Sequence, residues 1–199
     1  QLMAIYPNSA VVAGVAPFTD IFQISLADEG SNAIGCTLAL DSPYCFPLKT
    51  YPRFDTDPLA VAIAAMDGLE RRQWAILQIL FAPAREDWAN ALRQAIVNPY
   101  KPDDYWIEKL QVAQVNAKLQ HPLFAVSIRL AASQRDAFQH LVGWAAQFDN
   151  HPHQRLLPNT VDWEETDSPP DFERDWLQSS LFSRCTYRPG LLLNAEELA

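Results

Sequence analysis

The sequence has few cysteines, few glycines and no long hydrophobic run. Its three cysteines, Cys36, Cys45 and Cys185, are an odd and sparse set in a chain of 199 residues. They imply no disulfide framework and favour a reducing compartment, so we expect a cytoplasmic protein. No stretch approaches the ~20 consecutive apolar residues that a membrane-spanning helix requires, so no membrane span is expected.

Positive charge is also scarce. The chain has 15 Lys and Arg residues against 24 Asp and Glu residues, which gives a formal net charge of −9. Because proteins hold nucleic acids largely through Lys and Arg contacts to phosphates, this balance predicts no direct binding to nucleic acid. A hydrophobic content of 49% is typical of a folded globular chain, and the length favours one domain or at most two small ones.

The glycines exclude the known nucleotide-binding loops. None of the six glycines precedes a Lys-Ser or Lys-Thr pair, as a Walker A loop requires, and no two have the spacing of a dinucleotide fingerprint. No Ser lies in a G-x-S-x-G motif, and the cysteines lie in or beside apolar runs, where Cys most often acts as a small buried hydrophobe. We therefore expect no catalytic residue, no cofactor and no enzyme activity in this chain.

Two histidines leave one alternative open. His151 and His153 are separated by a single residue, and Asp149 lies close by. Two imidazoles and a carboxylate can hold zinc or iron, so a small metal-dependent hydrolase is a possible interpretation. Pro152 lies between the histidines and is typical of a turn, which favours a hydrated surface loop. No metal is expected, and the hydrolase is the less favoured alternative.

Hydrophobic patterning predicts an α+β fold. Residues 46–82 and 123–163 each have the pattern of a strand, a helix and a second strand. Between them we expect a pair of helices at 86–97 and 103–119. With right-handed crossovers, these units form a ferredoxin-like split βαβ sheet with an inserted helix pair.

The same patterning divides the chain into three parts. Residues 1–43 are expected to form an N-terminal lead-in and a β-hairpin, with strands at 18–27 and 35–40. Residues 44–165 are expected to form the βα(αα)βαβ core. Residues 166–199 are expected to form a C-terminal helix and a connection toward a downstream domain.

Several local signals mark element ends. Asp57 and Pro58 have the types typical of a helix N-cap and first position, and Ser133 and Asn194 are expected to cap later helices. Residues 74–82 are apolar at both parities, which predicts a central strand covered on both faces. A helix that begins at Asn194 so near the last residue predicts that this chain is cut from a longer protein.

Two tryptophans near helix starts are candidates for a protein interface. Trp is over-represented at the centres of interfaces, so Trp88 and Trp106 are the residues that we would first assign to one. The alternative is that both pack in the core, as most helix and strand aromatics do.

A linked set of short motifs resembles a known family. The set is F-P-L-K-T-Y at 46–51, D-P-L-A at 57–60, and W-A-I-L-Q-I-L-F-A-P at 74–83 with a Trp soon after. We take as signature residues Phe46, Pro47, Leu48, Tyr51, Asp57, Pro58, Leu59, Gln78, Pro83 and Trp88. They resemble the amino-terminal, non-ATPase region of FtsK/HerA-superfamily ATPases, the type IV secretory and conjugative DNA-transfer proteins.

This resemblance implies a function without chemistry. It makes the chain a non-catalytic accessory domain, used for assembly, docking or substrate gating, of a DNA- or protein-translocating ATPase. The expected partners are proteins, among them further copies in a ring and an ATPase domain downstream in the same chain. The alternative is a stand-alone interaction or adaptor domain of a phage or mobile element. A Walker A motif after Ala199 would favour the first interpretation.

Overall fold

The computed structural model describes residues 34–51, 53–70, 73–101, 104–159, 181 and 190–198. The chain divides into two compact units, Gln1–Ser31 and Asn32–Ala199, and all of the described residues belong to the second. The strand expected at 18–27 therefore lies outside the described residues. Within the described part, no helix is both long and apolar enough to span a membrane.

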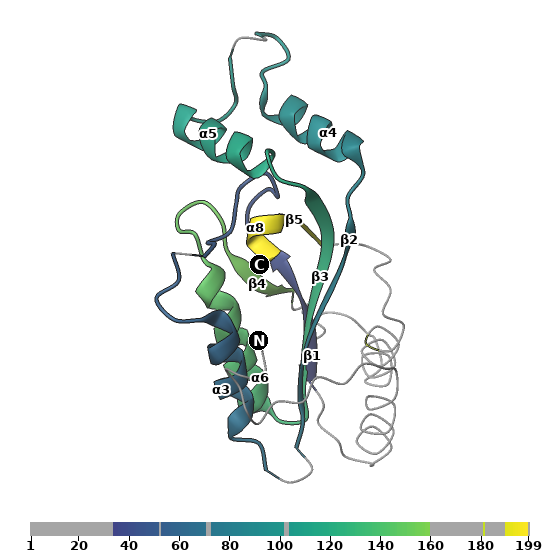
Figure 1. Ribbon diagram of the computed structural model, residues 1–199, viewed down its shortest axis with the longest axis vertical. Coiled ribbons are helices and arrows are strands. Elements are labelled where there is room, and N and C mark those ends of the chain that lie inside the picture. The colour runs from purple at the N-terminus through teal and green to yellow at the C-terminus, as the bar shows by residue number, and fades with distance from the viewer. Residues whose placement is uncertain are drawn as a thin grey trace, which may run out of the picture. The chain divides into compact units, whose positions relative to one another are not determined.

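The described strands form one antiparallel sheet with β3 at its centre (Figure 1). Along one edge β3 pairs with β2, and along its other edge it pairs first with β5 and then with β1, which in turn pairs with β4. The order is β2-β3-β1-β4, with β5 continuing the line of β1. The strand bounds are β1 Ile34–Leu40, β2 Ala75–Pro83, β3 Leu123–Ala132, β4 Leu156–Asn159 and β5 Leu191–Asn194.

The helices complete a ferredoxin-like arrangement. In chain order β1, α3 and β2 form one split unit, β3, α6 and β4 form the other, and α4 and α5 are inserted between them. Their bounds are α3 Pro58–Asp67, α4 Glu86–Ile96, α5 Lys109–Lys118, α6 Arg135–Ala145, the 3-10 turn η1 Ala146–Phe148, and α8 Ala195–Leu198. The predicted α+β class is confirmed, and the sheet order is that of the expected split βαβ sheet with its inserted helix pair.

The first strand of the sheet is not the one that the sequence predicted. Residues 46–51 form no strand, and β1, which was assigned to the lead-in before residue 44, takes its position. Pro47 has no backbone N–H, and its neighbours bind elsewhere: the Leu48 amide donates to the Glu197 carboxylate at 2.7 Å, and the Lys49 amide to the Phe148 carbonyl at 2.9 Å. The N–H groups of Leu48 and Lys49 are therefore not available for a sheet ladder.

The strand predicted to be central is an edge strand. β2 pairs only with β3 among the described strands, and Ile79 and Phe81 are 42% and 63% exposed. The strand covered on both faces is β3, in which every residue but Phe124 is buried. The prediction that residues 74–82 form a central strand covered on both faces was wrong. The hydrophobic pattern indicates that the strand is apolar on both faces, but it does not show which elements cover them.

The predicted helix starts had mixed outcomes. Asp57 caps α3, where its carboxylate accepts the Leu59 amide at 2.9 Å and Pro58 begins the helix, as predicted. Ser133 does not cap α6; its hydroxyl accepts the Trp74 amide at 3.0 Å and donates to the Trp74 carbonyl at 3.3 Å. Gln134 is the N-cap residue instead. α5 begins at residue 109 rather than 103.

Alternate residues of β3 face two separate hydrophobic clusters. Val126, Ile128 and Leu130 point to the face that α6 covers, where Leu141 and Trp144 pack. On the opposite face, at the start of β3, a smaller cluster joins the sheet to the inserted helices. Its buried members are Cys45, Phe46, Leu92, Ile96, Val115, Leu119, Leu123 and Leu192.

Candidate functional site

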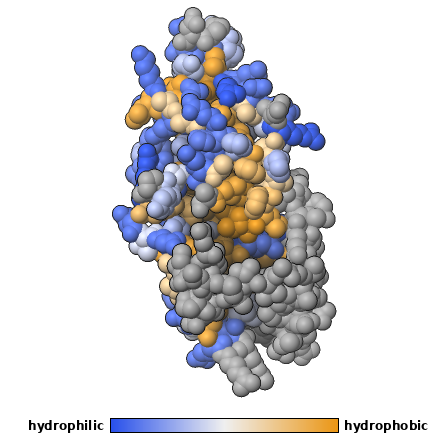
Figure 2. All heavy atoms as spheres, in the orientation of Figure 1, coloured by the Kyte–Doolittle hydropathy of each residue, from blue (hydrophilic) through white to orange (hydrophobic). Residues whose placement is uncertain are grey.

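An apolar hollow lies between α3, β2 and α8. It has a volume of about 300 Å³, and its wall includes Leu59 of α3, Leu77 and Ile79 of β2, Ile128 of β3 and Leu198 of α8. Figure 2 shows apolar side chains gathered on the face where α8 and the strands β2 and β3 lie in Figure 1. We call this hollow and the exposed apolar side chains beside it the α3–β2 groove.

The groove is formed by elements whose sequences suit a covered position. α3 reads P-L-A-V-A-I-A-A-M-D and is apolar nearly all round, a composition typical of a buried helix. Yet Ala62 is its one buried residue, and Leu59 and Ile63, one turn apart, are exposed. β2 shows the same disagreement, because it is apolar at both parities but exposed at Ile79 and Phe81.

Ionisable side chains around the hollow are mostly acidic. Asp57, Glu196 and Glu197 line it, together with Lys49. The Lys49 ammonium lies 3.5 Å from the Asp55 carboxylate. On α8, the Glu196 carboxylate lies 3.3 Å from His121 Nε2. The wall of the groove is therefore apolar, and its charge is predominantly negative.

The α8 wall is held by a buried ion pair. Lys118 Nζ lies 3.1 Å from a Glu197 carboxylate oxygen, and the two side chains are 0% and 1% exposed. Burial lowers the pKa of the Lys118 ammonium below its ordinary value, and the negative charge of Glu197 opposes that shift. The predicted cap at Asn194 is confirmed: its side chain accepts the Glu197 amide at 2.9 Å, while the Glu197 carboxylate accepts the Asn194 amide at 2.8 Å.

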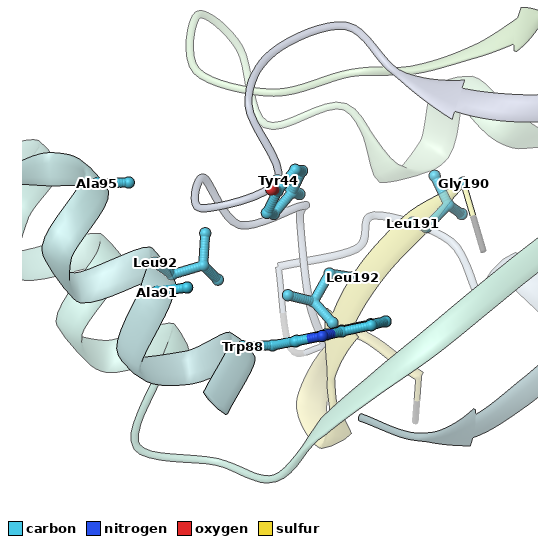
Figure 3. A pocket seen from close by; sticks show the side chains of 8 residues that line it. All are labelled: Tyr44, Trp88, Ala91, Leu92, Ala95, Gly190, Leu191 and Leu192. Atoms are coloured by element: carbon cyan, nitrogen blue, oxygen red, sulfur yellow. The ribbon is translucent and has the colours of Figure 1, made fainter. Parts of the chain in front are cut away.

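A second cavity of about 490 Å³ lies on the α4 side of the sheet (Figure 3). Ala91, Leu92 and Ala95 of α4 form one wall, and Tyr44 and Leu192 lie across from them. The Trp88 ring lines the same cavity and lies beside Leu192 in Figure 3.

The structure separates the two candidate interface tryptophans. Trp88 is half-buried in the first turn of α4, beside the second cavity. Trp106 is 60% exposed near the other end of that helix, where its amide donates to the Ile96 carbonyl at 3.0 Å. A helix of this length separates its ends by ~15 Å, so the two side chains do not form one site.

The signature residues gather in part at the α3–β2 groove. Five of them line it: Leu48, Tyr51, Asp57, Pro58 and Leu59. Phe46 is in the cluster beneath α4 and α5, and Pro83 ends β2. Gln78 points to the opposite face of the sheet, where its side chain accepts from Arg129 at 3.1 Å and donates to the Leu181 carbonyl at 3.0 Å.

His151 and His153 are not joined by a third metal-ligating side chain among the described residues. Among the described residues, no three His, Cys, Asp or Glu side chains gather as a metal site. His151 and His153 lie in a turn, as expected, and the Asp149 carboxylate accepts the Leu156 amide at 3.4 Å.

Two buried polar side chains that hold these elements in place, Lys118 and Gln154, were not predicted from the sequence. Lys118 is 79 residues from its partner Glu197, and no local pattern signals such a pair. Gln154 is fully buried and binds the loop after β1 through both ends of its amide. Its neighbours His151 and His153 were considered as metal ligands, but the residue of this turn with a structural role is Gln154.

Comparison with known proteins gives a family and no named relative. No curated protein and no solved structure matches the chain. Residues 1–139, more than half of the sequence, match a family described as a domain of unknown function (DUF8128). The chain therefore belongs to this family.

Proposed function

We propose that this chain is a non-catalytic accessory domain of a DNA- or protein-translocating ATPase, and that it docks another protein through the α3–β2 groove. One observation carries the docking role: α3 and β2 have the sequences of covered elements, yet both expose apolar side chains. Contiguous exposed apolar surface marks interaction sites on soluble domains. The motor to which the domain belongs is supported by the sequence resemblance alone.

The energetics suit a docking surface. Fully burying one large aliphatic or aromatic side chain contributes ~1.5–3 kcal/mol. A partner that covered the exposed parts of Leu59, Ile63, Ile79 and Phe81 would gain several kcal/mol before the entropy cost of association.

The charged groups of the groove have structural roles that fit binding better than catalysis. Glu197 is paired with Lys118 and accepts backbone amides, and Asp57 caps α3. Lys49 is paired with Asp55. The stand-alone adaptor would use the same groove, so only the presence of a motor separates these two functions.

The coding sequence after Ala199 is the first test. A downstream G-x-x-x-x-G-K-[ST] motif supports the accessory role, and its absence leaves the adaptor. With the motif present, we expect the full-length protein to hydrolyse ATP and residues 1–199 to show no turnover. ATP hydrolysis by residues 1–199 alone would refute the non-catalytic role. In the full-length protein, Ile79→Ser should weaken translocation or assembly more than Leu110→Ser, an exposed position on α5.

A further inference from the structure

We infer that the partner segment bound in the α3–β2 groove is an amphipathic helix with basic residues beside its apolar face. The inference rests on the proposed docking role and names the occupant of that same site. Its support comes from the spacing of the exposed apolar residues, the volume of the hollow and the charge of its wall.

The spacing suits a helix that lies along the groove. Ile79 and Phe81 are two residues apart on β2, which separates them by ~7 Å. Residues four apart on a helix are separated by ~6 Å along its axis, so successive apolar side chains of a helix match this pair. A strand added to the edge of β2 would instead leave Leu59 and Ile63 of α3 in water.

The volume suits side chains from a larger partner. A cavity of ~150 Å³ admits one benzene-sized group, so a hollow of about 300 Å³ takes about two such groups. A small apolar ligand could fill the hollow, but it would leave Phe81, which is 63% exposed, uncovered. A helix that inserts two apolar side chains can cover the exposed residues as well.

The charge of the wall favours a basic partner over a second copy of this chain. Lys118 neutralises Glu197, and Lys49 is paired with Asp55, which leaves the carboxylates of Asp57 and Glu196 as the further charges that line the hollow. Another copy would bring a net charge of −9 toward this acidic wall. Lys or Arg residues flanking an apolar helix face would meet opposite charge there.

The test uses a designed helix as the probe. A synthetic peptide of Leu and Lys, about 18 residues long with Leu spaced i, i+3, i+4 and i+7, is titrated calorimetrically into the whole chain. A matched peptide has Glu in place of every Lys. We expect the Leu/Lys peptide to bind at least about tenfold more tightly than the Leu/Glu peptide. Ile79→Ser should weaken its binding about tenfold, and Leu110→Ser should leave it unchanged.

Other outcomes would overturn the inference. Equal binding to wild-type chain and Ile79→Ser, with loss at about 500 mM salt, would mean nonspecific attraction to an acidic protein. Self-association that Ile79→Ser abolishes would make a second copy the occupant. Displacement of the probe by decanoate at stoichiometric amounts would favour a small apolar ligand. Thermal melting of Ile79→Ser checks that the variant folds.

The peptide-binding result and the test for a downstream motor motif can fail independently of each other. If the motor motif is present but the Leu/Lys peptide does not bind, the accessory role stands and the identity of the occupant is wrong. If the peptide binds but no motor follows, the groove inference stands and the chain is an adaptor.

Discussion

Lys118 at the end of α5 and Glu197 in α8 form an ion pair of 3.1 Å that is almost completely shielded from water. The pair links the inserted helices to the segment that walls the α3–β2 groove. Glu197 also accepts the Leu48 amide at 2.7 Å, so the loop before α3 is tied to the same carboxylate. This one carboxylate therefore links α5, α8 and the loop before α3.

Breaking the pair should be costly. Glu197→Gln leaves the Lys118 ammonium buried without an opposite charge, and its single amide oxygen can accept only one of the two backbone amides, of Leu48 and Asn194, that now bind separate carboxylate oxygens. We expect the free energy of unfolding to fall by ~3–5 kcal/mol, measured by urea denaturation. The double variant Lys118→Met/Glu197→Gln should lose less than the sum of the two single variants, because the two charges act on each other.

Lys109→Met is the control for this series. Lys109 begins the same helix but is exposed, so its replacement should change the free energy of unfolding by no more than ~0.5 kcal/mol. Equal losses at Lys109 and Lys118 would mean that the buried pair has no special role.

Replacing Gln154 with the isosteric residue Glu should also lower the free energy of unfolding. Its amide nitrogen donates to the carbonyls of Ser42 and Pro43 at 3.1 Å and of Phe46 at 3.3 Å. Gln154→Glu replaces this donor with a carboxylate oxygen that faces three carbonyl oxygens. We expect a loss of ~2–4 kcal/mol by urea denaturation at neutral pH, since a buried charged group is left without donors on that side. Gln120→Glu, at an exposed position, should be nearly neutral.

Cys36 predicts a pH dependence at the alkaline end. Burial in β1 raises the pKa of the Cys36 thiol to about 12, whereas the thiol of the unfolded chain ionises near 9. Above pH 9 the unfolded state loses this proton first, so the native state is destabilised as pH rises toward about 12. The difference in unfolding free energy between wild type and Cys36→Ala should therefore shrink by ~1.4 kcal/mol per pH unit in that window.

Leu38→Ala provides the comparison for that measurement. Leu38 is buried in the same strand but does not titrate, so the cost of its replacement should stay constant over the same pH range. A Cys36→Ala difference that also stays constant would show that the thiol is ionised as readily in the folded chain as in the unfolded one.

Local sequence patterns predicted most of the elements but not which of them would be covered. Asp57-Pro58 and Asn194 act within a few residues, so their caps could be predicted from neighbouring positions. The assignment of 46–51 as a strand failed because the amides of Leu48 and Lys49 bind groups about a hundred or more residues away. Such contacts leave no periodic pattern in the sequence.

The α3–β2 groove could not be predicted from the sequence, because local patterns do not show which elements meet. β2 and α3 carry the apolar residues of covered elements, and hydrophobic periodicity predicts burial without saying whether this chain or another supplies the cover. Half of the signature residues line the groove, yet no local pattern joins Tyr51 and Leu59 to Ile79. That relationship required the fold.

Isoleucine methyl NMR of the whole chain shows where an amphipathic helix with basic residues binds, and we expect it in the α3–β2 groove. On titration with the Leu/Lys peptide, we predict that the methyl signals of Ile63 and Ile79 shift together, because Ile79 lines the hollow and Ile63 is exposed one helical turn after Leu59, which also lines it. The signals of Ile96 and Ile107, in the cluster beneath α4 and α5, should stay in place. Shifts confined to Ile96 and Ile107, or no shift at Ile63 and Ile79 at saturating peptide, would contradict binding of a helix in the α3–β2 groove.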